Sequence, residues 1–140
     1  MKLACLIVVL VVATAGDARE QSRQDRLMDE IETQLTLPTG SLPLAQYARY
    51  YAEERGRVHG AYTTEIETRP ANVGCEVMQA DLTSKSTPCP AIADLKPGHR
   101  RWIKFSDYPA VAAESCRAVQ ILYNLKTRST EYAKCATPDY

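Results

Sequence analysis

The sequence predicts an α+β fold in which one or two N-terminal helices pack on an antiparallel sheet of about four to five strands, with two disulfides. Three observations favour this fold. Apolar residues recur at helical spacing up to Gly56 and alternate with polar residues after it. Of the five cysteines, all but the first lie beyond the N-terminal apolar run, an even number that favours paired sulfurs. The 140 residues suffice for one ordinary domain but not for two.

The N-terminus has the layout of a secretory signal peptide. One basic residue precedes an apolar run over residues 3–15, and the run ends in small residues. Signal peptidase requires small side chains just before the cut, so we expect cleavage after Ala15 or Ala18. An uncleaved anchor is the alternative, but a spanning helix needs about 20 apolar residues. Residues 1–18 are therefore predicted to direct export, and Cys5 to leave with them.

The mature chain is predicted to consist of a helical arm, residues 19–40, and a disulfide-stabilised α+β domain, residues 41–140. In the arm, three apolar residues at four-residue steps form a narrow stripe along one predicted helix: Leu27, Ile31 and Leu35. The stretch 37–40 contains proline and glycine and ends this helix.

A second helix is predicted to begin near Ser41 and to end at Gly56. Ser41 can cap it, and Pro43 falls in the first turn, where a missing N–H has no consequence. Four apolar residues would share one face: Leu44, Tyr47, Ala48 and Tyr51. Tyr50 would then be the exposed aromatic residue of this helix, which makes it a candidate for partner binding.

After this helix the pattern predicts strands. Residues 57–67 alternate in polarity, with Tyr62 on the apolar side and His59 on the polar side, which is typical of a half-buried strand. Two further strands are predicted over residues 73–80 and 101–105. A C-terminal hairpin supplies the last two.

That hairpin joins residues 116–123 to residues 128–135 through a loop of four residues. In the register that this loop implies, Cys116 lies directly opposite Cys135. Facing Cα atoms in an antiparallel pair are about 4.5–5.5 Å apart, a separation that a disulfide accepts. We therefore predict a Cys116–Cys135 disulfide, with the register and the bond each supporting the other.

The two remaining cysteines, Cys75 and Cys89, would form the second disulfide and close a loop rich in Thr, Ser and Pro. Such bonds persist in oxidising compartments. A zinc site with four cysteine ligands is the alternative, but it requires closely spaced cysteine pairs that this sequence lacks.

Composition excludes several classes of function. Basic and acidic residues number 17 each, whereas proteins that neutralise many phosphates carry a basic excess. No motif for a nucleotide, cofactor or metal ion is present. The histidines, His59 and His99, lack the neighbours that would mark a catalytic triad. Surface solvation explains the carboxylates Glu65, Glu67 and Glu76 more simply than a glycosidase-type pair does.

The densest basic stretch, residues 96–104, supplies the other candidates for partner binding: Arg100, Arg101 and Trp102. Basic side chains beside an aromatic ring suit an anion or an acidic partner. Alternation along a strand would place Arg101 and Trp102 on opposite faces, which splits the cluster. The alternative is an edge strand whose basic residues deter pairing with another chain.

Several segments carry a resemblance to known proteins: 42–52, 58–62, 74–78, 107–111 and 116–123. Together they resemble a family of small, exported, uncharacterised proteins of Gram-negative bacteria, across most of residues 42–136. This resemblance implies a periplasmic or secreted location and carries no activity.

A second resemblance is to the secreted cystatins, which combine a signal, a helix, an inhibitory Q-x-V-x-G turn, strands and two consecutive disulfides. Residues 56–60, Gly-Arg-Val-His-Gly, stand where that motif would lie. Gly56 replaces its glutamine. The Pro-Trp of the second inhibitory loop is absent from the hairpin turn at 124–127.

The sequence therefore predicts a non-enzymatic exported protein, secreted or periplasmic, whose partner is another protein or an envelope surface. It predicts no cofactor, no metal ion, no nucleic-acid partner and no stable membrane span. A cystatin-like inhibitor of thiol proteases is the first alternative. A small hydrolase that uses His59 or His99 is the second.

Overall fold

The structure, a computed structural model, describes residues 6–69, 74–89 and 91–138, with side chains described from residue 16 onward. The chain divides into two units, one ending at Leu35 and one beginning at Thr36. The predicted signal peptide lies largely outside the described side chains and stays a prediction.

The first unit is one helix, α1, which spans Leu6–Gln34. It contains most of the predicted arm and continues without a break through the predicted cleavage region. Leu27 and Ile31 of the predicted stripe are buried, and Met28 beside them is buried as well. Among the described residues, no helix has the length and apolar character needed to cross a membrane.

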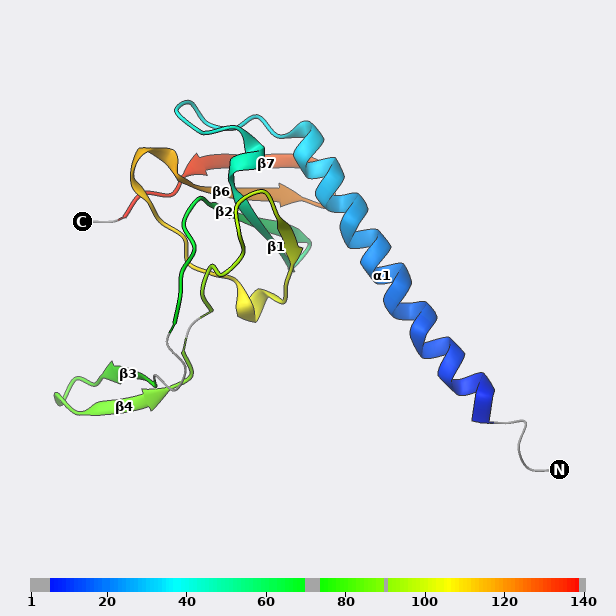
Figure 1. Cartoon of the computed structure of the whole chain (residues 1–140), viewed down its shortest axis with the longest axis horizontal. Coiled ribbons are helices and arrows are strands. Elements are labelled where there is room, and N and C mark those ends of the chain that lie inside the picture. The colour runs from blue at the N-terminus through cyan, green and yellow to red at the C-terminus, as the bar shows by residue number, and fades with distance from the viewer. Residues whose placement is uncertain (1–5, 70–73, 90, 139–140) are drawn as a thin grey trace. The chain divides into compact units, whose positions relative to one another are not determined.

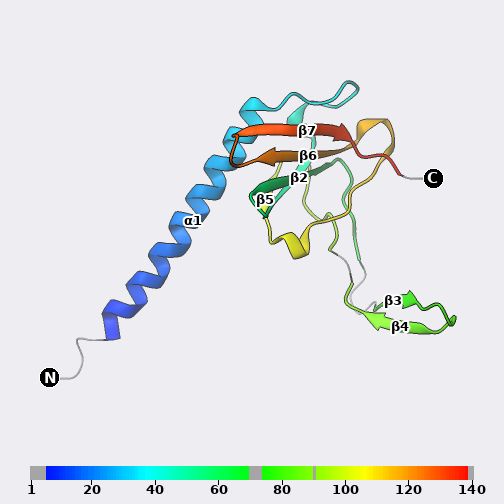
Figure 2. The ribbon, with the colours of Figure 1, turned by 180° about the vertical axis from the view of Figure 1, so that it is seen from behind.

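The second unit contains a five-stranded sheet in the order β5-β1-β2-β6-β7 (Figures 1 and 2). Neighbouring strands are antiparallel except for β5, which is parallel to β1. The predicted α+β class is confirmed, with a mixed sheet in place of a purely antiparallel one. The strands of this sheet are β1 (Ala48–Glu54), β2 (Arg57–Thr63), β5 (Arg100–Trp102), β6 (Ala118–Asn124) and β7 (Ser129–Cys135).

A separate two-stranded sheet pairs β3 (Cys75–Met78) with β4 (Ser84–Thr87). The strand predicted over 73–80 is therefore present as β3, while Val73 itself lies outside the described residues. The strand predicted over 101–105 is present as β5 and is shorter, because a 3-10 turn begins at Phe105.

The predicted second helix is wrong. Only a 3-10 turn, Leu44–Gln46, follows Pro43, and β1 occupies the rest. Apolar side chains cover β1 from both sides, so buried residues do not alternate along it: Tyr47, Ala48, Tyr50, Tyr51 and Ala52. A short strand buried on both faces cannot be told from a helix by periodicity alone. Tyr50, predicted to be exposed, is 2% exposed.

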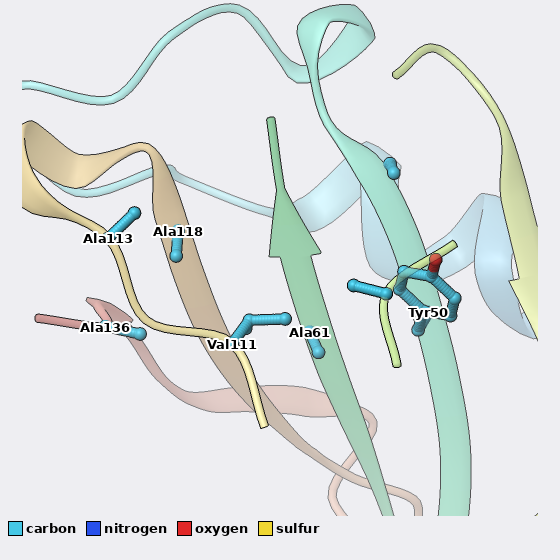
Figure 3. Close-up of a cluster of buried hydrophobic side chains, with 8 residues drawn as sticks. Tyr50, Ala61, Val111, Ala113, Ala118 and Ala136 are labelled. Atoms are coloured by element: carbon cyan, nitrogen blue, oxygen red, sulfur yellow. The ribbon is translucent and has the colours of Figure 1, made fainter. Parts of the chain in front are cut away.

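Strand β2 is also buried on both faces, which corrects the half-buried strand predicted over 57–67. The two faces were assigned correctly, since Tyr62 and His59 point to opposite sides. The His59 side is covered by the segment that follows β5, so Ala61 on that side is fully buried (Figure 3). The strand ends at Thr63, and Ile66 beyond it is 48% exposed.

Small side chains build the core on the covered face. Alanines dominate it, which lets the covering segment approach the sheet closely, and Tyr50 fills the largest volume: Ala48, Tyr50, Ala61, Ala93, Val111, Ala113, Ala118 and Ala136 (Figure 3). On the opposite face, Tyr51 and Tyr62 meet edge to face, and their hydroxyl oxygens lie 2.6 Å apart in a buried hydrogen bond.

The C-terminal hairpin is present, but its predicted register is wrong. Cys135 lies opposite Val119, not opposite Cys116. The Cys116–Cys135 disulfide nevertheless forms, with a Cα–Cα distance of 4.7 Å. Cys116 precedes β6, and the left-handed backbone at Ser115 and Cys116 (φ 54° and 57°) turns the chain so that the sulfurs meet.

The Tyr47 hydroxyl holds the segment before β1 against the start of β6. It donates a hydrogen bond to the Cys116 carbonyl oxygen at 2.7 Å and accepts one from the Leu42 backbone N–H at 2.9 Å. The Tyr47 side chain is fully buried, and its bond to the Cys116 carbonyl lies out of reach of water.

We expect Tyr47→Phe to lower the free energy of unfolding by about 1–3 kcal/mol, because it leaves the Leu42 N–H and the Cys116 carbonyl without this partner. Urea unfolding followed by circular dichroism measures the change. Tyr132→Phe is the control, because Tyr132 is 40% exposed, and it should change stability by less than about 0.5 kcal/mol. Equal effects of the two substitutions would contradict this role for the Tyr47 hydroxyl.

Candidate functional site

Both predicted disulfides are present, and they remove four thiols from consideration as catalytic or metal-binding groups. Cys75 is bonded to Cys89 with a Cα–Cα distance of 5.0 Å, and Cys116 to Cys135. Within the described residues, no group of His, Cys, Asp and Glu side chains is arranged to hold a metal ion.

The basic stretch lies at an edge of the sheet, as the edge-strand alternative predicted, because β5 is the outermost strand beside β1. The side chains of Arg101 and Trp102 in this stretch have separate partners. Trp102 stacks on the buried Tyr51 ring, with centroids 6.5 Å apart. Arg101 reaches Asp94 in a surface ion pair of 3.2 Å, of a kind that contributes little to stability.

Two predicted candidates, Tyr50 and Arg101, meet in a cleft of about 370 Å³ that Arg69, Asp94 and Asp107 also line. The Tyr50 hydroxyl donates to Asp94 Oδ1 at 3.4 Å and accepts a hydrogen bond from a backbone N–H. Burial, together with the nearby Asp94 carboxylate, raises the pKa of Tyr50. Tyr50 therefore supports the cleft wall from inside and is not an exposed contact residue.

The two histidines lie in different settings. The His59 ring packs on Phe105 and Tyr108, with centroids at 4.9 and 6.0 Å. Burial is the main reason that the pKa of His59 is below its ordinary value, since it penalises the charged ring. His99 is exposed, in the turn before β5, where its backbone N–H donates to the Lys96 carbonyl.

Glu67 and Glu76, two of the carboxylates weighed above as a glycosidase-type pair, form hydrogen bonds in separate segments of the chain. Glu67 is joined to Ala93 through its backbone N–H at 2.7 Å and through its carboxylate at 3.3 Å. Glu76 accepts a hydrogen bond from Ser84 across the β3–β4 hairpin. The carboxylates of Glu67 and Glu76 therefore each have a structural partner, in different segments.

A site that the sequence did not predict lies where two hairpin turns meet at one end of the sheet. The β1–β2 turn is formed by Arg55 and Gly56, both left-handed (φ 49° and 77°), and the β6–β7 turn spans residues 125–128. The Leu125 backbone N–H donates to the Gly56 carbonyl oxygen at 3.1 Å. We call residues 53–57 and 124–131 the turn edge.

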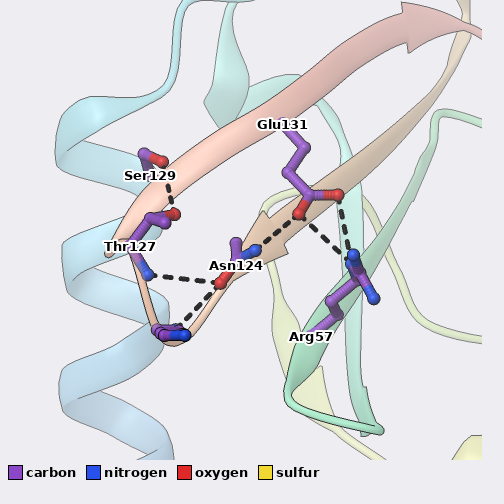
Figure 4. Close-up of polar contacts among 6 residues, drawn as sticks. Arg57, Asn124, Thr127, Ser129 and Glu131 are labelled. Carbon is purple, nitrogen blue, oxygen red and sulfur yellow. Dashed lines mark hydrogen bonds and ion pairs between the residues drawn. The ribbon is translucent and has the colours of Figure 1, made fainter.

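Glu131 holds the turn edge together (Figure 4). Its carboxylate accepts hydrogen bonds from Arg57 Nε at 3.1 and 3.2 Å and from Asn124 Nδ2 at 2.6 Å. These two donors lower the pKa of Glu131, Asn124 more than Arg57. Asn124 Oδ1 in turn accepts from the backbone N–H groups of Lys126 and Thr127 at 2.9 and 3.2 Å. The polar groups of both turns are thus fixed by one network.

The irregularity in β7 explains why Glu131 reaches this network. Leu122 pairs with Tyr132, whereas Tyr123 pairs with Thr130, so Glu131 is the extra residue of a β-bulge. A bulge redirects a side chain and commonly lies beside a functional site. The same extra residue is one reason that the predicted hairpin register is wrong.

The exposed side chains of the turn edge are mainly cationic, because, of its three carboxylates, Glu53 and Glu54 are half-buried and Glu131 is held by Arg57. Four cationic side chains are exposed there: Arg55, Arg57, Lys126 and Arg128. Because the backbone beneath them is already ordered, a partner that binds here pays little conformational entropy. The turn edge contains no histidine or cysteine, and the Glu131 carboxylate is held by Arg57 and Asn124, so the arrangement suits recognition more than catalysis.

The cystatin-like segment 56–60 is only partly a turn. Gly56 belongs to the β1–β2 turn, but Val58 is 1% exposed and lies within β2. Gly60 is buried in the same strand, and a Cβ added there would lie 3.2 Å from the Ile121 Cβ. A protein that contacts this end of the sheet would meet Arg55 and Gly56, not Val58.

Comparison of the chain with known proteins gives no family assignment, since no protein-family model, no curated protein and no solved structure matches it.

We expect His59 to titrate below pH 6.5, its ordinary value, in an NMR pH titration of its ring proton. As the pH falls, the His59 ring is protonated in the unfolded chain before it is protonated in the folded one. The free energy of unfolding is therefore unaffected by this ring above about pH 6.5, and it decreases as the pH falls from there toward the pKa of His59 in the folded state. His59→Gln should remove this part of the pH dependence of unfolding. A His59 midpoint at or above 6.5 would contradict the expectation.

Proposed function

We propose that this chain is an exported, non-enzymatic protein that binds another protein through the turn edge. The observation that carries the proposal is the joining of two exposed turns, distant in sequence, by the Leu125–Gly56 hydrogen bond and the Glu131 network. Two disulfides support export, because such bonds form and persist in oxidising compartments.

The exposed charges indicate the chemistry of the partner. Arg55, Lys126 and Arg128 lie around a backbone with fixed hydrogen bonds, so an acidic protein surface fits this edge best. Opposite charges at an interface mainly accelerate association and make binding sensitive to salt. The Arg57–Glu131 pair remains internal to the edge and positions the turns.

A thiol-protease inhibitor of cystatin-like build is the second candidate. One observation favours it: the two contact elements named by that resemblance, at Gly56 and in the final hairpin, lie side by side at one end of the sheet. The missing glutamine and Pro-Trp weaken it. A hydrolase ranks last, since the His59 ring is packed on two aromatic rings and His99 lies in an exposed turn.

Charge reversal at the turn edge tests the first proposal. We expect Arg55→Glu combined with Lys126→Glu to reduce crosslinking to the native partner in the exported fraction at least about tenfold, because both cations face that partner. Lys96→Glu combined with Lys104→Glu is the matched control, with the same charge change at other exposed lysines. Equal loss in both variants would assign the effect to net charge and contradict the proposal.

Papain titration tests the second candidate. An inhibitor lowers papain activity in a stoichiometric, saturable manner, and Leu125→Glu should abolish this effect because Leu125 lies in the contact turn beside Gly56. Val58→Asp is unsuitable, since it buries a charge in β2 and unfolds the sheet. Full papain activity at a large excess of the wild-type protein would exclude papain-type inhibition and leave the first proposal intact.

A further inference from the structure

The β3–β4 hairpin, residues 75–89, exposes large apolar side chains. Val77 is 52% exposed, Met78 67% and Leu82 83%. The Cys75–Cys89 disulfide closes the hairpin at its base, so the exposed residues belong to a covalently constrained loop. Large apolar side chains gathered on one exposed element indicate an interaction site more often than single scattered ones do.

These side chains surround the hairpin. Val77 pairs with Lys85 and Met78 with Ser84, and neighbouring residues in a strand point to opposite faces. Val77 and Met78 therefore lie on opposite faces, and Leu82 occupies the turn between the strands. A flat protein surface would cover only one of these faces.

Several polar groups of the tip bond to one another. Gln79 N–H donates to the Thr83 carbonyl at 2.8 Å, and Leu82 N–H to the Gln79 carbonyl at 3.0 Å. Asp81 Oδ1 accepts from the Thr83 backbone N–H at 3.0 Å and from its hydroxyl at 2.6 Å. The backbone N–H groups of Gln79, Leu82 and Thr83 are thus paired within the loop, which lowers the cost of moving the tip out of water.

Leu82 adopts a conformation that is unfavourable for its side chain. Its φ of 66° lies in the left-handed region, which bulky residues rarely adopt and asparagine or glycine adopt readily. Such strain persists mainly where the surrounding structure or a function requires it. Here the hydrogen bonds of Gln79 and Asp81 hold the backbone in this conformation, and as a result the Leu82 side chain is exposed to solvent.

We propose that this hairpin inserts its tip, Met78 and Leu82 first, into the interfacial layer of a phospholipid membrane. Each face of the hairpin carries one large apolar side chain beside polar ones, with Lys85 next to Val77 and Ser84 next to Met78. The interfacial layer of a fluid bilayer can take up the apolar side chains of both faces and of the tip while the polar ones stay among the headgroups, as a flat protein surface cannot. This membrane contact is distinct from the protein-binding turn edge and does not depend on it.

Charge specifies the lipid class. The hairpin contains Glu76, Asp81 and Lys85, a formal net charge of −1. Anionic headgroups therefore give no added attraction, and zwitterionic phosphatidylcholine is the expected surface. Three apolar side chains give weak, reversible binding, comparable to or below that of a single acyl chain.

Flotation with phosphatidylcholine vesicles tests the proposal on the full disulfide-bonded chain. We expect the wild-type protein to float with the vesicles, and Leu82→Asn to lower its partition coefficient about tenfold, since one buried leucine is removed. Asparagine accepts the left-handed backbone, so the tip keeps its shape. Ile66→Ser is the matched control and should leave binding unchanged, because Ile66 is exposed outside the hairpin.

Fluorescence reports the insertion directly. Leu82→Trp should shift its emission to shorter wavelength with phosphatidylcholine vesicles and be quenched by brominated lipid, whereas Trp102 of the wild-type protein should not respond. Absence of vesicle binding at millimolar lipid would overturn the proposal. So would vesicle binding lost equally in Leu82→Asn and Ile66→Ser, or a dimer that Leu82→Asn dissociates without any vesicle binding, which would assign the hairpin to self-association. Binding that requires anionic lipid and disappears in salt would assign the contact to the basic turn edge.

Discussion

The junction at Cys116 holds together segments that the sheet alone would leave apart. Its carbonyl accepts a hydrogen bond from the Tyr47 hydroxyl, its sulfur is bonded to Cys135, and Ser41 Oγ lies 3.2 Å from that sulfur. One residue thus fixes the chain before β1, the start of β6 and the end of β7. The left-handed backbone at Ser115 and Cys116 persists because the covalent bond and the buried hydrogen bond together determine it. The pairing of β6 with β7 at this end of the sheet depends on this arrangement.

Features that depend on local sequence could be predicted, whereas those that depend on one extra residue could not. The even number of cysteines beyond the N-terminal apolar run, the C-terminal hairpin and the edge position of the basic strand follow from composition and short patterns. The register does not, since it requires the bulge at Glu131 and the true turn at residues 125–128. The predicted Cys116–Cys135 pair is confirmed although the predicted register is wrong, because proximity in the hairpin survives a shift of a few residues.

Burial of β1 on both faces explains why the sequence predicts a helix in its place and an exposed Tyr50. Tyr50 and Tyr51 of β1 point to opposite sides and are both buried, so the strand shows the spacing of a helix rather than an alternation. What covers the second face is a distant segment that local patterns do not reveal. The sequence fails to predict the turn edge for a different reason, because Arg57 and Glu131 are far apart in sequence and meet only after β2, β6 and β7 have paired. The nearest signal in the sequence was the cystatin-like segment, which marked Gly56.

The completeness of packing and hydrogen bonding in the core of the sheet helps to explain the exposed β3–β4 hairpin. Even the polar ends of the core aromatics are paired, since Tyr47 bonds to Cys116 and Tyr51 to Tyr62. The rest of the covered face is filled largely by alanine, so the core closes with small volumes and few aliphatic side chains. Each large aliphatic side chain that a core of this kind buries adds to its stability. An exposed Leu82 contributes none of this stability to the fold. Because the hydrogen bonds of its neighbours hold this leucine outward, contact with an apolar surface outside the domain explains its position better than incomplete packing does.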